Sequence, residues 1–178
     1  MARLNVVDPK SATGRVKEIF DGPLKGMEIN LFKGMANSPV GLDTYLGFAG
    51  ALKSAKLSGK EGEAIALAVG EDNNCDYCVA AHTTLGQKQG LSEDQTVAIR
   101  KNESTGDNRI DALVAFARAI NENRGFVSDE DVQSFRDAGF DDGAIVEVLV
   151  YVTLNTYTNF FNHINQTEVD FPAVPALA

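Results

Sequence analysis

Two cysteines and a histidine stand within eight positions of this chain, in the segment Cys75-Asp76-Tyr77-Cys78-Val79-Ala80-Ala81-His82. They are its only two cysteines and one of its two histidines. Two thiols spaced C-x-x-C can close a disulfide with little backbone movement, and an imidazole can move a proton near neutral pH. The segment therefore combines groups for thiol redox chemistry with a group for proton transfer.

A helix that starts at or beside Cys75 and ends near Gln89 is predicted to position these groups. Asn73 and Asn74 precede it, and asparagines favour helix ends and caps over helix interiors. Gly90 follows the segment and is a typical helix terminator. The two cysteines would then span the first turn of the helix.

On such a helix Cys78 and His82 are four residues apart, so their side chains can meet. Cys75 lies about 10 Å from His82 along the axis, which is too far for a direct hydrogen bond. If His82 acts as a base, it is expected to serve Cys78. The helix N-terminus would instead favour Cys75 as the thiol of low pKa. The two arguments disagree on which cysteine attacks first.

Two other interpretations of the cysteines do not require catalysis. Cysteine is among the most buried residue types, so Cys75 and Cys78 can act as small core residues. With His82 and a carboxylate they can also form a zinc site. Three ligands on one helical face suit a tetrahedral centre poorly, and the chain has no second C-x-x-C.

The preceding helix carries a candidate proton carrier, Glu63. Ser58-Gly59-Lys60-Glu61 has the pattern of a capping box and opens a helix from Lys60 to Glu71 that is mostly apolar and therefore buried. A glutamate in the first turn often faces solvent and complements the helix dipole. Because Glu61 fills that role, Glu63 is free to face the cysteines, where partial burial would make it a usable acid or base.

The run from Leu57 to Glu71, followed by the run from Asn74 to Thr83, resembles the AhpD-like, carboxymuconolactone decarboxylase superfamily. The thiol branch of that family carries a glutamate on one helix, then C-x-x-C, then a histidine four residues later. The close match covers roughly residues 38–101 and is looser toward the C-terminus. The residues at the four positions of the motif are Glu63, Cys75, Cys78 and His82.

The resemblance implies an all-α, AhpD-like bundle of six to eight helices that assembles as a homo-oligomer, a trimer or hexamer. It also implies thiol-dependent hydroperoxide reductase or disulfide reductase activity. In that branch the second cysteine, here Cys78, attacks the peroxide, and the first, Cys75, resolves the product to a disulfide. Glu63 and His82 would relay the proton. A thioredoxin-like or lipoyl-bearing dithiol protein would then reduce the pair.

Two alternative functions stay open. A lactone decarboxylase would use Glu63 and His82 as acid and base while the cysteines only pack. Family members with that activity generally lack the cysteine pair, which argues against it. The second alternative is a metal-binding or redox-sensing protein without turnover.

Composition limits the compartment and the partners. A length of 178 residues with 44% hydrophobic and 23% charged residues suits one globular domain over residues 1–178. A net charge of −9 argues against nucleic acid and anionic membranes as partners. No apolar run reaches the ~18 residues of a membrane span, and the N-terminus lacks a signal-peptide pattern. We therefore expect a cytoplasmic protein, and no motif indicates a cofactor or a metal.

The chain is expected to divide into an N-terminal arm with a short helix (1–37), the core that carries the motif (38–101), C-terminal helices (107–166) and a tail (167–178). Ser38-Pro39 is predicted to cap and start a helix, and the segment Gly26 to Met35 is predicted to be a loop. The remaining helices are expected at Ser11–Phe20, Pro39–Leu52, Glu93–Lys101, Asn108–Asn123, Asp129–Ala138 and from Asp141 or Asp142 to about Asn165.

The last helix is apolar nearly all round and should be buried in the core or in a subunit interface. Its polar residues are expected to bond across a subunit contact or, alternatively, to line the pocket; they are Asn155, Tyr157, Asn159, Asn162 and His163. Tyr77 is expected to pack in the core with its hydroxyl at a polar rim, or to line the substrate pocket. The tail from Asp170 to Pro175 is expected to lie on a neighbouring subunit.

Overall fold

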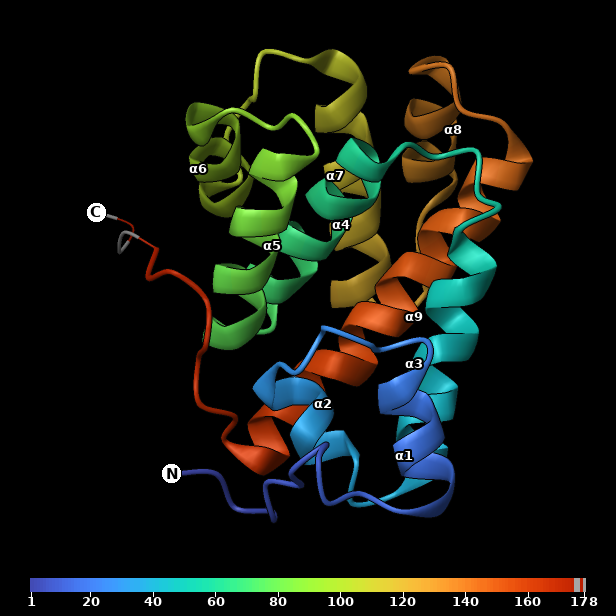
Figure 1. Ribbon diagram of the computed structural model, residues 1–178. Coiled ribbons are helices and arrows are strands. Elements are labelled where there is room, and N and C mark those ends of the chain that lie inside the picture. Colours follow the sequence, from blue (N-terminus) through green and yellow to red (C-terminus); the bar gives the residue numbers. More distant parts are fainter. Residues whose placement is uncertain (175–176, 178) are drawn as a thin grey trace.

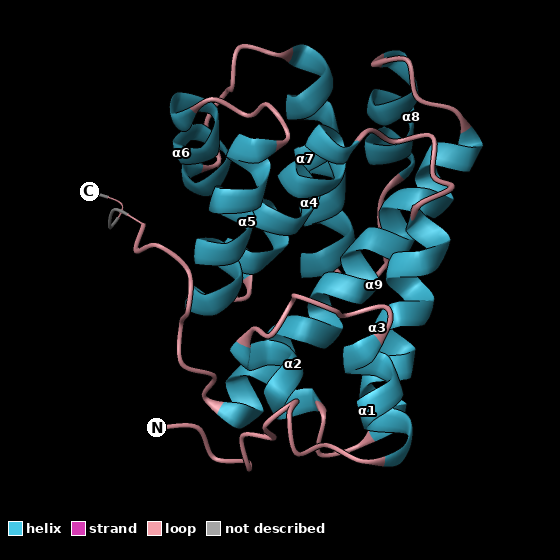
Figure 2. Ribbon diagram, viewed as in Figure 1, coloured by secondary structure: helices cyan, strands magenta, loops and turns pink. Residues whose placement is uncertain are grey.

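The computed structural model describes residues 1–174 and 177, and this part of the chain is all-helical (Figure 1, Figure 2). The predicted fold class is therefore confirmed. Eight of the helices correspond to the eight predicted segments, and α2 is additional. The helices are α1 (Gly14–Asp21), α2 (Asn30–Met35), α3 (Pro39–Leu52), α4 (Gly59–Asp72), α5 (Asp76–Lys88), α6 (Glu93–Lys101), α7 (Asn108–Glu122), α8 (Asp129–Asp137) and α9 (Asp142–Asn165).

Helix α4 lies at the centre of the fold and packs against α5, α6, α7 and α9. Its apolar residues are fully buried, as the sequence predicted: Ala64, Ile65, Leu67, Ala68 and Val69. The predicted capping box is also present, because the Ser58 hydroxyl accepts from the Glu61 N–H and the Glu61 carboxylate accepts from the Ser58 N–H at 2.7 Å. The box fixes where α4 begins and therefore which way Glu63 points.

Glu61 is held as a charged group at this helix start. Burial raises the pKa of Glu61, but hydrogen bonds from Ser58 and from the Arg109 guanidinium outweigh it and hold the pKa below its usual value. Arg109 Nε lies 2.7 Å from a Glu61 oxygen. The carboxylate is therefore committed to α4 and α7 and takes no part in the cavity described below.

A tight turn joins α4 to α5 and brings the cysteines onto α4. Asn74 adopts a left-handed backbone with a φ of 55°, and Cys75 is the N-cap of α5. The Cys75 sulfur accepts from the Cys78 N–H at 3.3 Å. Gly70 permits the close packing, since a Cβ at this position would lie 3.3 Å from the Cys78 Cβ. The predicted helix start beside Cys75 is thus confirmed.

The long helix α9 has two unlike faces. One face is buried against α4 and α7 and includes Val148, Val152, Asn155, Asn159 and Asn162. The other face exposes four large apolar side chains: Val146, Leu149, Phe160 and Ile164. The predicted burial in the core is confirmed for the first face, and burial of the second face in a subunit interface stays a prediction.

The prediction of a loop from Gly26 to Met35 is wrong over its second half, which forms α2. Six residues are too few for a stable isolated helix, so distant groups must stabilise it. The N–H of Asn30 donates to the Asp170 carboxylate at 2.7 Å, and the N–H of Leu31 donates to the Tyr77 hydroxyl at 3.3 Å. These contacts from the tail and from α5 supply the cap that the local sequence lacks.

The described part of the tail makes contacts with its own chain, and the expectation that the tail lies on a neighbouring subunit stays a prediction. The Tyr77 hydroxyl donates to Asp170 at 2.8 Å, and the rings of Tyr77 and Phe171 meet edge to face at 5.6 Å. The predicted end of the tail at Pro175 lies outside the described residues. Ser38 occupies the predicted N-cap of α3, but its side chain makes no capping hydrogen bond.

Within the described residues, the helices are all too short or too polar to cross a bilayer.

Candidate functional site

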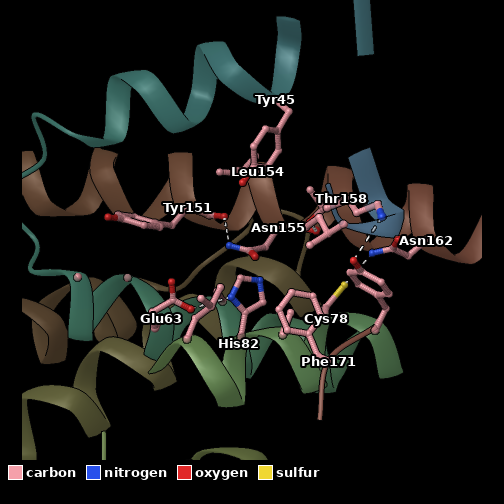
Figure 3. A pocket seen from close by; sticks show the side chains of 18 residues that line it. Tyr45, Glu63, Cys78, His82, Tyr151, Leu154, Asn155, Thr158, Asn162 and Phe171 are labelled. Carbon is pink, nitrogen blue, oxygen red and sulfur yellow. Dashed lines mark hydrogen bonds and ion pairs between the residues drawn. The ribbon is translucent and has the colours of Figure 1, made fainter. Parts of the chain in front are cut away.

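A cavity of about 220 Å³ lies between α4, α5 and α9 (Figure 3). Glu63 comes from α4, while Cys78 and His82 come from α5. Helix α9 closes the opposite side, α3 contributes Tyr45, and the tail contributes Phe171. Most of the wall is apolar or aromatic, so the few polar groups in it are the ones that can act on a bound molecule. The α9 residues in the wall are Tyr151, Leu154, Asn155, Thr158 and Asn162.

Glu63 and His82 form a hydrogen-bonded pair in this wall. Nδ1 of His82 lies 2.8 Å from the Glu63 carboxylate, and each side chain is 21% exposed. An ionised carboxylate only accepts hydrogen bonds, so Nδ1 carries the hydrogen and Nε2 is the basic nitrogen. The pair can therefore accept a proton at Nε2 and stabilise the resulting imidazolium.

The two cysteines are joined in a disulfide, with their Cα atoms 5.3 Å apart, and each is only 2% exposed. Cys78 lines the cavity that holds Glu63 and His82. Cys75 lines two hollows on the outer side, together with Asn74 and Asp76. Cys78 thus belongs to the wall of the cavity, and Cys75 belongs to the walls of the two outer hollows.

The sequence predicted that the side chains of His82 and Cys78 can meet, and both line the cavity. The imidazole of His82 is directed to Glu63, and the described residues show no hydrogen bond between His82 and the Cys78 sulfur. A cavity of about 220 Å³ has room for several water molecules at about 30 Å³ each. A proton can therefore pass between Cys78 and His82 through a water or through the substrate.

Two tyrosines in the wall, Tyr45 and Tyr151, carry hydroxyls that can donate a hydrogen bond. Burial, and then the negative charge of Glu63, raises the pKa of Tyr45. Burial, and then the charges of nearby glutamates, raises the pKa of Tyr151. Gly62 lets Tyr151 approach α4, because a Cβ at this position would lie 2.6 Å from the ring. Both phenols therefore stay protonated and can donate to an oxygen in the cavity.

Tyr77 also lines the cavity, but its hydroxyl is already committed. Burial, and then the hydrogen bond to Asp170, raises the pKa of Tyr77 far above its usual value. The hydroxyl joins α5 to α2 and to the tail through Leu31 and Asp170. Tyr77 therefore supports the cavity wall, in agreement with the predicted core packing.

Several polar residues of α9 have partners within the chain, and bonding across a subunit contact stays a prediction. Asn159 accepts from Asn73 at 2.8 Å, the Tyr157 hydroxyl donates to the Gly41 carbonyl, and the His163 ring meets the Asn74 carbonyl. Asn155 and Asn162 line the cavity, which was the alternative interpretation.

No pattern in the sequence placed three aromatic residues in the wall, Tyr45, Tyr151 and Phe171. Each reaches the cavity only through tertiary packing. Among the described residues, no group of three or more His, Cys, Asp or Glu side chains is arranged to hold a metal ion.

Comparisons with known proteins agree with this fold and motif. Residues 39–119 match the model of the carboxymuconolactone decarboxylase family, a segment that contains Glu63, both cysteines and His82. Comparison with the curated proteins gave no match.

Several solved structures share the fold. An alkylhydroperoxidase AhpD core, an uncharacterized peroxidase-related protein from Ralstonia eutropha JMP134, superposes with a TM-score of 0.85 at 19% identity over 95% of this chain and 92% of that one. A peroxidase-related protein from Silicibacter sp. TM1040 superposes with a TM-score of 0.78 at 20% identity over 93% and 89%. The debrominase Bmp8, in complex with 2,3,4-tribromopyrrole, superposes with a TM-score of 0.76 at 14% identity over 96% and 94%. Residues 39–119, with Glu63, the C-x-x-C pair and His82, are thus similar to the carboxymuconolactone decarboxylase family, and the chain shares the fold of these AhpD-like solved structures.

Proposed function

We propose that this protein is a thiol-dependent hydroperoxide reductase that cycles through the Cys75–Cys78 disulfide. The observation that carries the proposal is that one cavity brings together the Cys78 sulfur and the hydrogen-bonded pair of Glu63 and His82. A redox-active sulfur and a proton carrier at one small cavity are the two groups that cleavage of an O–O bond requires.

In the oxidative half of the cycle, Nε2 of His82 in the Glu63–His82 pair takes the proton of the Cys78 thiol through a water, and the resulting thiolate attacks the terminal oxygen of the hydroperoxide. The S–O bond forms, the O–O bond breaks, and the departing alkoxide takes a proton from the Glu63–His82 pair to leave as the alcohol. Cys78 is then a sulfenic acid. The Cys75 sulfur attacks it, the S–S bond forms, and the oxygen departs as water. The cysteine pair has lost the two electrons that the peroxide has gained.

In the reductive half, a dithiol partner restores the pair by thiol–disulfide exchange. A thioredoxin-like or a lipoyl-bearing protein has the required chemistry. We assign its first attack to Cys75, since this residue lines the outer hollows. A mixed disulfide forms at Cys75 and releases Cys78 as a thiolate, and the second thiol of the partner then frees Cys75. The partner leaves as a disulfide.

Reductive debromination is a second candidate function. A structural neighbour of this chain is a debrominase in complex with 2,3,4-tribromopyrrole. The aromatic wall formed by Tyr45, Tyr151 and Phe171 suits a small ring in a cavity of about 220 Å³. The same thiol pair would convert a C–Br bond to C–H while forming the disulfide and releasing bromide and a proton.

Titration of the thiols tests these functions. The protein is reduced, freed of reductant under anaerobic conditions and treated with one equivalent of cumene hydroperoxide per chain. We expect both of its thiols to be consumed and one equivalent of alcohol to form. The same titration is made with 2,3,4-tribromopyrrole in place of the peroxide. If the thiols persist in peroxide but are consumed by the bromopyrrole with release of bromide, the debrominase function is supported. Thiols that persist in both would refute thiol turnover and leave the lactone decarboxylase.

We also propose that the protein is a homo-oligomer that buries the exposed apolar face of α9. Phe160 is 56% and Ile164 is 62% exposed, and single soluble chains rarely leave such a row of large apolar side chains in water. Light scattering coupled to gel filtration should give a mass above one chain for the native protein. Phe160→Glu combined with Ile164→Glu should lower this mass to one chain, whereas the loop substitution Phe126→Glu should not. A native protein of monomeric mass would refute the proposal.

A further inference from the structure

Asn162 is the polar side chain of α9 that lies beside the Cys78 sulfur (Figure 3). Its Nδ2 lies 3.3 Å from the Cys78 sulfur and 3.8 Å from the Cys75 sulfur. The side chain is buried, lies in the last turns of α9 and lines the same cavity as Glu63 and His82. An amide N–H donor is thus fixed beside both sulfurs and is nearer to the one that faces the cavity.

The other end of this amide has no partner. Asn162 Oδ1 is buried and accepts no hydrogen bond in the structure, which is costly for an acceptor removed from water. A disulfide has no hydrogen to donate. Reduction turns the pair into a thiolate and a thiol, and the thiol S–H is a donor. The reduced pair therefore contains both an acceptor and a donor for the Asn162 amide, whereas the disulfide contains no donor.

The two sulfurs compete for the negative charge of the reduced state. Cys75 is the N-cap of α5 and accepts the Cys78 N–H at 3.3 Å, an arrangement that favours a thiolate at Cys75. Cys78 receives no such help from the helix end. The nearer N–H of Asn162 is the contact that can reverse the preference, because a hydrogen bond to a charged acceptor is stronger than one to a neutral acceptor.

We propose that Asn162 is a positioning residue that holds the Cys78 sulfur as a thiolate facing the cavity, so that Cys78 rather than Cys75 becomes the nucleophile. Its Oδ1 is then available to accept the S–H of the remaining thiol. The consequence for turnover rests on the proposed function, whereas the order of ionisation of the two thiols does not.

Titration of single-cysteine variants tests the inference. Cys75→Ser leaves only Cys78, and Cys78→Ser leaves only Cys75. In each background the ultraviolet absorbance of the thiolate is followed against pH, with and without Asn162→Ala. We expect Asn162→Ala to lower the acid dissociation constant of Cys78 by about 10-fold to 100-fold, the effect of losing a hydrogen bond to a charged group. The constant of Cys75 should change much less.

Asn162→Asp adds a second, nearly isosteric variant, which also covers failure of the alanine variant to fold. Its carboxylate places a negative charge beside Cys78 and should suppress ionisation of this thiol more strongly than alanine does. The matched control is Asn155→Ala. Asn155 lies in the same wall two turns earlier, but its amide donates to the Tyr151 carbonyl at 2.8 Å rather than to a sulfur. The constant of Cys78 should be unchanged in this control.

The inference is overturned if Cys78 ionises equally well with and without Asn162, or if Cys75 responds as strongly as Cys78. Both outcomes are measured by thiol ionisation and do not depend on whether the protein reduces peroxides. A protein that fails to consume peroxide while Asn162→Ala impairs ionisation of Cys78 would refute the proposed function and leave the inference intact. Peroxide consumption with an unchanged Cys78 would refute the inference alone.

Discussion

Substitution of Cys78 by serine should abolish hydroperoxide consumption. Cys78 contributes the sulfur that lines the cavity beside Glu63 and His82, and a serine hydroxyl remains protonated where a thiol can ionise. We expect the rate to fall by several orders of magnitude, as it does when other enzymes lose their nucleophile. The measurement is the loss of peroxide with time in the presence of an excess of a small dithiol. Cysteine and serine are similar in size, so the thermal midpoint of the reduced protein should change little.

The matched control is Cys75→Ser, which changes the residue that lines the outer hollows and keeps the Cys78 sulfur. This variant should consume one equivalent of peroxide and stop at the sulfenic acid of Cys78, because no second thiol is present to form the disulfide. A reagent specific for sulfenic acids, followed by mass spectrometry of the peptide, locates the product. If Cys78→Ser retains a first turnover and Cys75→Ser does not, the roles of the two cysteines are reversed. Cys75, which the N-terminus of α5 favours as the thiolate, is then the nucleophile.

Much of the fold could be predicted from the sequence, because most of its helices begin and end at local signals. Ser58 and Ser92 form their capping boxes, and Asp107 and Asp141 cap the helices that follow them. Each of these signals depends on residues within one turn of the helix end. The position of Glu63 follows from the same kind of signal, since the cap of α4 sets its direction.

The parts that could not be predicted depend on contacts between distant residues. Helix α2 is capped by Asp170, which stands 140 residues further along the chain. The same tail residue orients Tyr77, and the next residue, Phe171, completes the cavity wall. The spacing of one helix alone places His82 near Cys78. Its imidazole meets the Glu63 carboxylate of α4, and no rule based on one helix includes that partner.

Glu63→Gln should slow peroxide reduction by about 10²-fold to 10⁴-fold, the contribution of a positioned proton carrier. The amide can still accept a hydrogen bond from His82 Nδ1, so the imidazole keeps its place, but a neutral amide does not stabilise an imidazolium as a carboxylate does. The loss should therefore appear in the rate at saturating substrate and not in folding. Steady-state kinetics together with the thermal midpoint of the same sample separate these effects.

Glu61→Gln is the matched control, because the same change is made two residues earlier on the same helix. The Glu61 carboxylate pairs with Arg109, and its pKa in the folded protein is lowered. The pair therefore stabilises the fold at pH values above the pKa of Glu61 in the unfolded chain, about 4.3, and this stabilisation is lost as the pH falls through the pKa in the folded protein. The control should therefore lose about 1 kcal/mol of stability at neutral pH, a modest amount because Arg109 is half exposed, and the difference should vanish in acid. Its turnover should be that of the native protein. If Glu63→Gln turns over at the native rate, Glu63 is only a structural partner of His82. If both variants lose turnover equally, the loss comes from a disturbed start of α4 and not from the loss of proton transfer by Glu63.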